Sequence, residues 1–256
     1  VAENPSDGLY ISGAEWIIVR EKIGDIDIYG NFFPEDSALA EQYVSAAADY
    51  IRMYEELIGP YAHPKFAVVE NFFSTGYGMP SWTLLGQQVV RLPWIVKTSL
   101  GHEVCHNWWG NGVFVEYDAG NWCEGLTTYC ADYLYKQQES AEDAAKYRRQ
   151  IDQDFTVYVH RGNDFPLREF TSRTETFTRA VGYGKSAMLF HMLRQEVGDG
   201  DFWDALGRFY RDNLWQKASW ADIQAAFEAE TGEDLCWFFH QWVEKTGAPR
   251  LQVSDA

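Results

Sequence analysis

The stretch that decides the fold is Gly101-His102-Glu103-Val104-Cys105-His106-Asn107-Trp108-Trp109-Gly110-Asn111. His102 and His106 are four residues apart, so on an α-helix they lie about 40° apart on one face. Glu103 lies one position further round, close to the same site. The opposite face is apolar and would anchor the helix in the core, through Leu100, Val104 and Trp108. The stretch therefore predicts a helix that presents two imidazoles and a carboxylate to one site.

These residue types at this spacing favour a bound metal ion. Two imidazoles and one carboxylate suit zinc, which would keep a fourth position for water. The ion would lower the pKa of that water towards about 7, and Glu103 would then be placed to take its proton. The sequence therefore predicts one zinc ion, held by His102, His106 and a third ligand from elsewhere in the chain.

The third ligand is expected from the helix that follows. Glu124 begins the next helical pattern, in Asn121-Trp122-Cys123-Glu124-Gly125. Glu116 and Asp118 are alternatives, but they fall in the connecting loop. A loop carboxylate is better suited to accept a ring N–H from a ligating histidine, which orients the ring. We therefore expect Glu124 as the ligand and Glu116 or Asp118 as the orienting carboxylate.

Outward from this helix, the two ends of the chain have different patterns. Upstream, short apolar or alternating runs predict strands at 16–19, 26–29, 66–69 and 82–90, and one long helix between Pro34 and Gly59. Downstream, helical periods fit the ranges 96–109, 122–138, 141–160, 180–197, 201–213, 220–231 and 234–246. Strands followed by helices predict an α+β fold. We expect a strand-rich part over 1–95, with its one long helix, and a helical part over 96–250.

The composition excludes several classes of function. The 256 residues include 21 Lys+Arg against 38 Asp+Glu, a formal net charge of −17. That charge repels phosphate backbones, so no nucleic-acid partner is expected. No run of eighteen or more apolar residues occurs, which predicts a soluble protein without a membrane span. The chain begins at Val1 with no signal-peptide pattern, so we expect that either a leader has been removed or the chain is a domain of a longer polypeptide.

Together these motifs resemble the catalytic domain of the membrane alanine aminopeptidase and leukotriene hydrolase family, the gluzincin metallopeptidases. Residues 102–111 are similar to its His-Glu-x-x-His-x-Trp-Phe-Gly-Asn pattern, and 123–125 to its Asn-Glu-Gly ligand segment. Tyr183-Gly184-Lys185-Ser186 is similar to its Tyr-x-Lys-Gly motif. The resemblance covers about residues 60–250. It implies a thermolysin-like α+β fold, a single catalytic domain over 1–256, and zinc-dependent hydrolysis of a peptide substrate, most simply as an aminopeptidase.

The resemblance also implies roles for individual residues. His102, His106 and Glu124 would bind the zinc ion. Glu103 would be the general base that activates a water molecule and later protonates the leaving amine. Tyr183 would donate its hydroxyl to the oxyanion of the tetrahedral intermediate.

Two departures from the family pattern stand out. Residues 107–123, seventeen in number, separate the second histidine from Glu124, one fewer than usual. The Gly-x-Met-Glu-Asn motif of exopeptidases is replaced by Gly76-Tyr77-Gly78-Met79-Pro80-Ser81-Trp82. Gly78 and Met79 are still expected to form a strand edge that binds an extended peptide. The glutamate that would hold the substrate's α-ammonium has no counterpart, and Glu70 is the nearest acidic residue upstream.

Three alternatives follow from these observations. The missing ammonium anchor would suit an endopeptidase or a dipeptide-releasing peptidase. A family member without catalysis would be a binding scaffold, but a scaffold has no need of Glu103 and Tyr183. The 11 tryptophans and many carboxylates also fit a glycoside hydrolase, which needs two facing carboxylates about 5–9.5 Å apart. That last hypothesis leaves the histidine helix unexplained.

Overall fold

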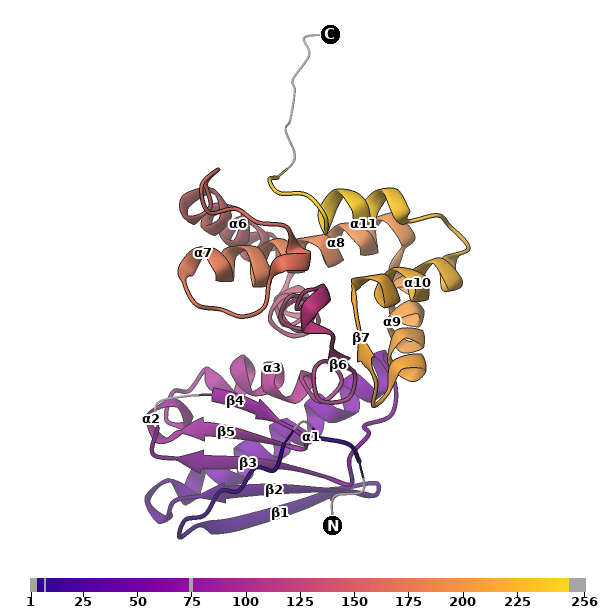
Figure 1. The fold of residues 1–256 in the computed structure, drawn as a ribbon. Coiled ribbons are helices and arrows are strands. Elements are labelled where there is room, and N and C mark those ends of the chain that lie inside the picture. The colour runs from indigo at the N-terminus through magenta and orange to yellow at the C-terminus, as the bar shows by residue number, and fades with distance from the viewer. Residues whose placement is uncertain (1–3, 7, 74–75, 249–256) are drawn as a thin grey trace.

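A five-stranded sheet forms one half of the molecule (Figure 1). The structure, a computed structural model, describes residues 4–6, 8–73 and 76–248. The strand order is β1-β2-β3-β5-β4, with β2, β3 and β5 parallel and the two outer strands antiparallel to their neighbours. The strands are β1 Ile17–Ile23, β2 Ile26–Phe32, β3 Lys65–Asn71, β4 Gly76–Met79 and β5 Trp82–Gly86.

The long helix α1 (Ala40–Leu57) covers one face of this sheet. Its buried side chains recur at intervals of three and four residues, as expected for an amphipathic helix, and include Tyr43, Ala47, Ile51 and Tyr54. Gly30 in β2 allows the close approach, because a Cβ there would lie 2.8 Å from the side chain of Val44. From Phe66 onward β3 is buried at every position, as is typical of a parallel strand covered on both faces.

Helices form the other half of the chain (Figure 1). The α-helices are α2 Gln87–Val90, α3 Ser99–Cys105, α4 Cys123–Thr128, α5 Leu134–Glu139, α6 Ala141–Tyr158, α7 Thr176–Arg179, α8 Ser186–Val197, α9 Asp199–Asn213, α10 Trp220–Thr231 and α11 Cys236–Trp242. Two segments, Tyr129–Tyr133 and Ala180–Lys185, are π-helical. Two short parallel strands, β6 Phe114–Val115 and β7 Lys217–Ala218, lie among the helices.

The α+β fold class is confirmed, and the differences from expectation are local. The strand expected over 82–90 ends at Gly86, and residues 87–90 form a helical turn instead. An apolar run alone does not distinguish a buried strand from a buried helix. The helix expected over 96–109 spans only Ser99–Cys105. There the backbone N–H of Asn107 donates to the carbonyl of Val104, only three residues back and 3.0 Å away, and the Asn107 side-chain amide donates to the same oxygen, 3.1 Å away.

Helix α3 lies along β4 and β5, between the sheet and the helical half (Figure 1). It also contacts α1, α4 and the π-helical segment 129–133. This position places the histidine helix where the two halves meet. In the part of the chain that the structure describes, no helix has the length and apolar character needed to cross a bilayer.

Candidate metal centre

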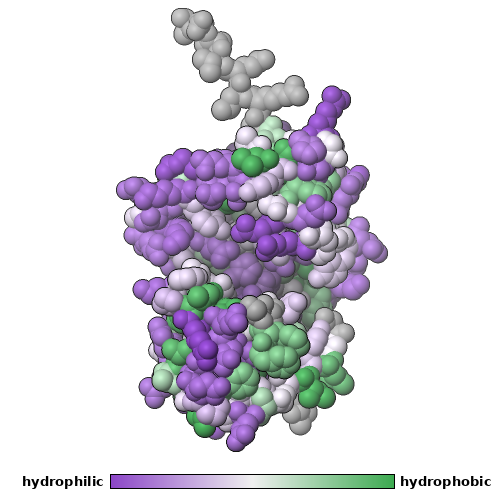
Figure 2. All heavy atoms as spheres, turned by 90° about the vertical axis from the view of Figure 1, so that its left-hand side faces the viewer, coloured by the Kyte–Doolittle hydropathy of each residue, from purple (hydrophilic) through white to green (hydrophobic). Residues whose placement is uncertain are grey.

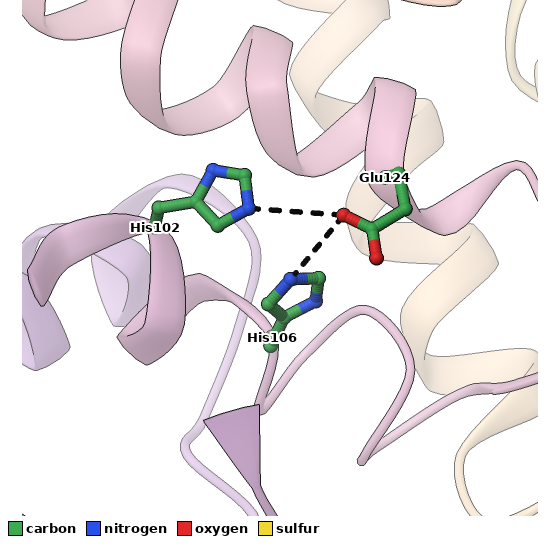
Figure 3. Close-up of side chains that lie close together, drawn as sticks. All are labelled: His102, His106 and Glu124. Atoms are coloured by element: carbon green, nitrogen blue, oxygen red, sulfur yellow. Dashed lines mark ion pairs between the residues drawn. The ribbon is translucent and has the colours of Figure 1, made fainter. Parts of the chain in front are cut away.

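Three side chains from two helices converge on one point (Figure 3). His102 lies within α3 and His106 at its C-terminal cap, where the backbone N–H of His106 still donates to the carbonyl of His102. Glu124 lies in the first turn of α4. Its Oε2 atom is 3.8 Å from Nε2 of His102 and 3.7 Å from Nε2 of His106. Among the described residues these three form a group whose ligand atoms all lie within 4.8 Å of one another.

The spacing and chemistry of this group fit a zinc ion. The distances of 3.7 and 3.8 Å are too long for hydrogen bonds. Two ligand atoms each about 2.1 Å from a tetrahedral zinc ion lie about 3.4 Å apart, and at most about 4.2 Å apart. The side chains are therefore held as ligands around a small cation would be, with the nitrogen and oxygen donors that zinc prefers.

Each histidine is held in this orientation through its other ring nitrogen. Nδ1 of His102 lies 3.1 Å from Oδ2 of Asp132, and Nδ1 of His106 lies 3.1 Å from the carbonyl oxygen of Trp109. Such contacts place the ring proton on Nδ1 and leave Nε2 free to bind a metal.

Asp132 takes the orienting position that we expected Glu116 or Asp118 to occupy. Glu116 instead lies 3.7 Å from the ammonium group of Lys217, and Asp118 is exposed in the turn 117–119. On an ideal α-helix, a residue eight positions after Glu124 would lie about 80° round from it. The π-helical segment Tyr129–Tyr133 adds one residue to the turn, which returns Asp132 to the face of Glu124.

The charges at this point stabilise a cation. Burial disfavours the protonated imidazole of His102, but the carboxylates of Asp132 and Glu124 outweigh this and hold its pKa well above the usual value. Burial likewise disfavours the Glu124 carboxylate, yet His102 and His106 lower its pKa to about 2. The carboxylates therefore stabilise positive charge between the rings, as a proton or as a metal ion.

Glu103 faces the same cavity, which has a volume of about 570 Å³ and is also lined by His102, His106 and Glu124. Strand β4 runs past this carboxylate, and a Cβ on Gly78 would lie 2.8 Å from its Oε2. Gly78 lines the cavity from β4. Met79 pairs with Trp82 at the end of β4 and is not among the described residues that line the cavity.

Tyr183 lines the cavity beside Glu124, from the second π-helical segment. Burial, together with the charge of Glu124, raises the pKa of its hydroxyl far above the usual value. The hydroxyl therefore keeps its proton at neutral pH and can act as a hydrogen-bond donor. Gly182 allows the backbone to pass against the ring of Phe170, where no Cβ would fit.

Glu70 does not supply an ammonium anchor in this cavity. Its side chain is fully buried, accepts a hydrogen bond of 2.7 Å from the backbone N–H of Phe33, and is absent from the described residues that line the cavity. Burial, with the neighbouring Asp36, raises its pKa to about 7. It belongs to the interior beside the sheet.

Comparisons with known proteins agree with this geometry. The model of the peptidase family M1 domain matches residues 44–242. The alanine/arginine aminopeptidase of Saccharomyces cerevisiae is 24% identical over 242 residues, 87% of this chain and 28% of that protein. The probable aminopeptidase 2 of Sulfurisphaera tokodaii is 21% identical over 96% of this chain and 34% of its own length. The chain thus spans about a third or less of these two relatives.

Solved structures show the same fold. An M1 zinc metallopeptidase from Deinococcus radiodurans superposes with a TM-score of 0.72 at 22% identity, over 93% of this chain and 53% of that one. Yeast LTA4 hydrolase superposes with a TM-score of 0.69 at 15% identity, over 92% of this chain and 40% of that one. Since the family model covers most of the chain, this protein belongs to peptidase family M1.

Proposed function

We propose that this chain is the catalytic part of a zinc-dependent peptidase that removes residues from the N-terminus of peptides. The observation that carries the proposal is the convergence of the three ligand atoms within 4.8 Å, in a cavity that also contains Glu103 and Tyr183. The relatives named above as aminopeptidases support the same activity.

Each residue of the site has a separate role in the proposed reaction. His102, His106 and Glu124 would hold zinc, which when bound makes water a nucleophile near neutral pH and polarises the substrate carbonyl. Glu103 would accept a proton from the attacking water and pass it to the leaving amine. Tyr183, which keeps its proton, would donate a hydrogen bond to the oxygen that becomes negative during attack.

The peptide would lie along β4, the outer strand of the sheet. Extended peptides bind such edges through backbone hydrogen bonds. Gly76 and Gly78 line the cavity on this strand, where their lack of side chains leaves the backbone accessible beside Glu103.

A second candidate function follows from Pro80, which stands after Met79 where the exopeptidase motif has its glutamate. Without an acidic group there, a free substrate ammonium gains less from binding. The alternative is a peptidase that cleaves inside a chain or releases dipeptides.

One experiment separates these functions. The purified protein is loaded with zinc and incubated with one peptide carrying a free or an acetylated N-terminus, and the products are identified by mass spectrometry. Release of single residues from the free peptide alone supports the aminopeptidase, whereas cleavage of both peptides supports the alternative. Glu103→Gln should abolish turnover while the zinc content stays near one ion per chain. Turnover that survives this change would show that Glu103 is not the base.

A further inference from the structure

Two arginine side chains line the 570 Å³ cavity, which we call the cleft, from the helical half of the chain. Arg173 lies in the segment before α7 and Arg179 at its last residue, and both line the 570 Å³ cavity together with Tyr183. Both side chains are exposed. In the described parts of the chain, the ion pairs formed by arginines involve neither of them. The cleft therefore contains two positive charges without an acidic partner.

Two of the three acidic residues that line the same cavity already face a histidine. Glu124 faces the two histidines, and Asp132 is held by Nδ1 of His102. Glu103, the third, lies beside Gly78 of β4. In a chain with a net charge of −17, two arginines left unpaired beside these acids leave room for a negative group of a ligand.

Both arginines lie close to the centre of the proposed reaction. The charge of Arg173 offsets part of the rise in the pKa of the Tyr183 hydroxyl. Arg179 also lines a second cavity of about 90 Å³, which shares Asp132 and Tyr183 with the main one. On the face that carries α6 and α7, hydrophilic side chains predominate over the helical half and line the hollow beneath it (Figure 2).

A planar guanidinium matches a carboxylate with two parallel hydrogen bonds. We propose that Arg173 and Arg179 bind a carboxylate of the peptide, so that the site selects substrates that carry one. The carboxylate is the C-terminus of a short peptide or an acidic side chain. This inference rests on the proposed peptidase function. In this arrangement β4 binds the peptide backbone, and Arg173 and Arg179 bind the negative charge of the peptide.

Four matched peptides test the proposal and separate the two sources of the carboxylate. Ala-Ala-Ala is compared with its C-terminal amide, and amidated Ala-Glu-Ala with amidated Ala-Gln-Ala. We expect kcat/KM to favour the acid in at least one pair by about tenfold, the scale of a charge-assisted hydrogen bond. A preference in the first pair identifies the C-terminus, and one in the second pair the side chain. No preference in either pair would overturn the proposal.

Variants assign any preference to the arginines. Arg173→Gln and Arg179→Gln, alone and together, should lower the ratio of kcat/KM between the acid and its neutral partner towards one. Lysine at both positions should keep part of the preference, because the charge remains. The control is Arg161→Gln, an exposed arginine that lines neither cavity. A uniform loss for all four peptides would refute carboxylate binding and indicate an effect through Tyr183.

A binding measurement keeps this test separate from that of the peptidase function. The zinc-loaded Glu103→Gln protein is titrated with the same peptides by calorimetry. Tighter binding of the acids that disappears on Arg173→Gln/Arg179→Gln supports the arginine site even if the wild-type protein hydrolyses nothing. Hydrolysis with equal affinity for acid and amide would refute the arginine site and leave the peptidase function standing.

Discussion

Replacing Asp132 with Asn tests whether this residue positions a metal ligand. Its Oδ2 atom lies 3.1 Å from Nδ1 of His102. Asparagine keeps the size and an acceptor oxygen but removes the negative charge. Loss of a carboxylate that orients a ligating histidine typically lowers metal affinity 10- to 100-fold. We therefore expect zinc binding to weaken by about 1.4 to 2.7 kcal/mol.

The size of this effect should depend on pH. In the metal-free protein, Asp132 helps to raise the pKa of His102, so protons compete with zinc above the usual range of histidine titration. Asp132→Asn lowers that pKa and weakens the competition. The loss of zinc affinity should therefore be smaller at pH 6 than at pH 8.

The assay is competition for zinc with a chromophoric chelator, measured at both pH values. Asp118→Asn is the matched control, because this exposed residue in the turn 117–119 makes no contact with either histidine in the described structure. The reasoning would be refuted if Asp132→Asn bound zinc as tightly as the wild type. An equal loss for Asp118→Asn would point to the loop carboxylate that the sequence suggested.

Three further changes test other features of the structure. Gly78→Ala places a Cβ 2.8 Å from Oε2 of Glu103, so this carboxylate, the proposed base, must shift, and we expect kcat/KM in a peptide assay to fall about 10- to 100-fold. Burial raises the pKa of the Glu70 carboxyl to about 7 in the folded protein, so as pH rises the unfolded chain loses this proton first. The stability that the protonated Glu70 contributes is therefore fully present below about pH 4.5 and is lost as pH rises to 7. Between pH 5 and 8, the free energy of unfolding of Glu70→Gln should therefore fall by about 2 kcal/mol less than that of the wild type, measured by urea unfolding. Ser140→Ala removes an acceptor 3.0 Å from the backbone N–H of Asp143 at the start of α6, and should lower the free energy of unfolding by about 1 kcal/mol in the same assay.

Each change has a control on a similar residue. Gly76→Ala should leave activity nearly unchanged, because its Cβ would lie 3.6 Å from Glu103, an ordinary contact. Glu56→Gln, an exposed carboxylate, should not alter the pH dependence of unfolding, and Ser45→Ala, exposed within α1, should not lower stability. Gly78→Ala with full activity, Glu70→Gln with an unchanged decline, or Ser140→Ala with wild-type stability would each contradict the corresponding argument.

The order of strands and helices was predictable because hydrophobic periods are local. The α1 pattern and the later helices α6, α9 and α10 lie close to their expected ranges. The errors lie where a tertiary contact overrides the pattern. Residues 87–90 have the pattern of a continued strand but form a helical turn, and α3 ends early beside the contact in which Oδ1 of Asn107 accepts a hydrogen bond from the backbone N–H of Ser81.

The sequence by itself determined the spacing of His102 and His106, because one helical turn places residues four apart on the same face whatever surrounds the helix. It also indicated Glu124 and Tyr183, through motifs that resemble a family. Only the tertiary structure decided which carboxylate orients His102, because a π-helical turn moves Asp132 into a register that α-helical periodicity does not predict. The arginines of the cleft likewise come together with the candidate metal site only in the folded chain, where they line the same cavity as residues of α3 and β4, and no local pattern in the sequence encodes that approach.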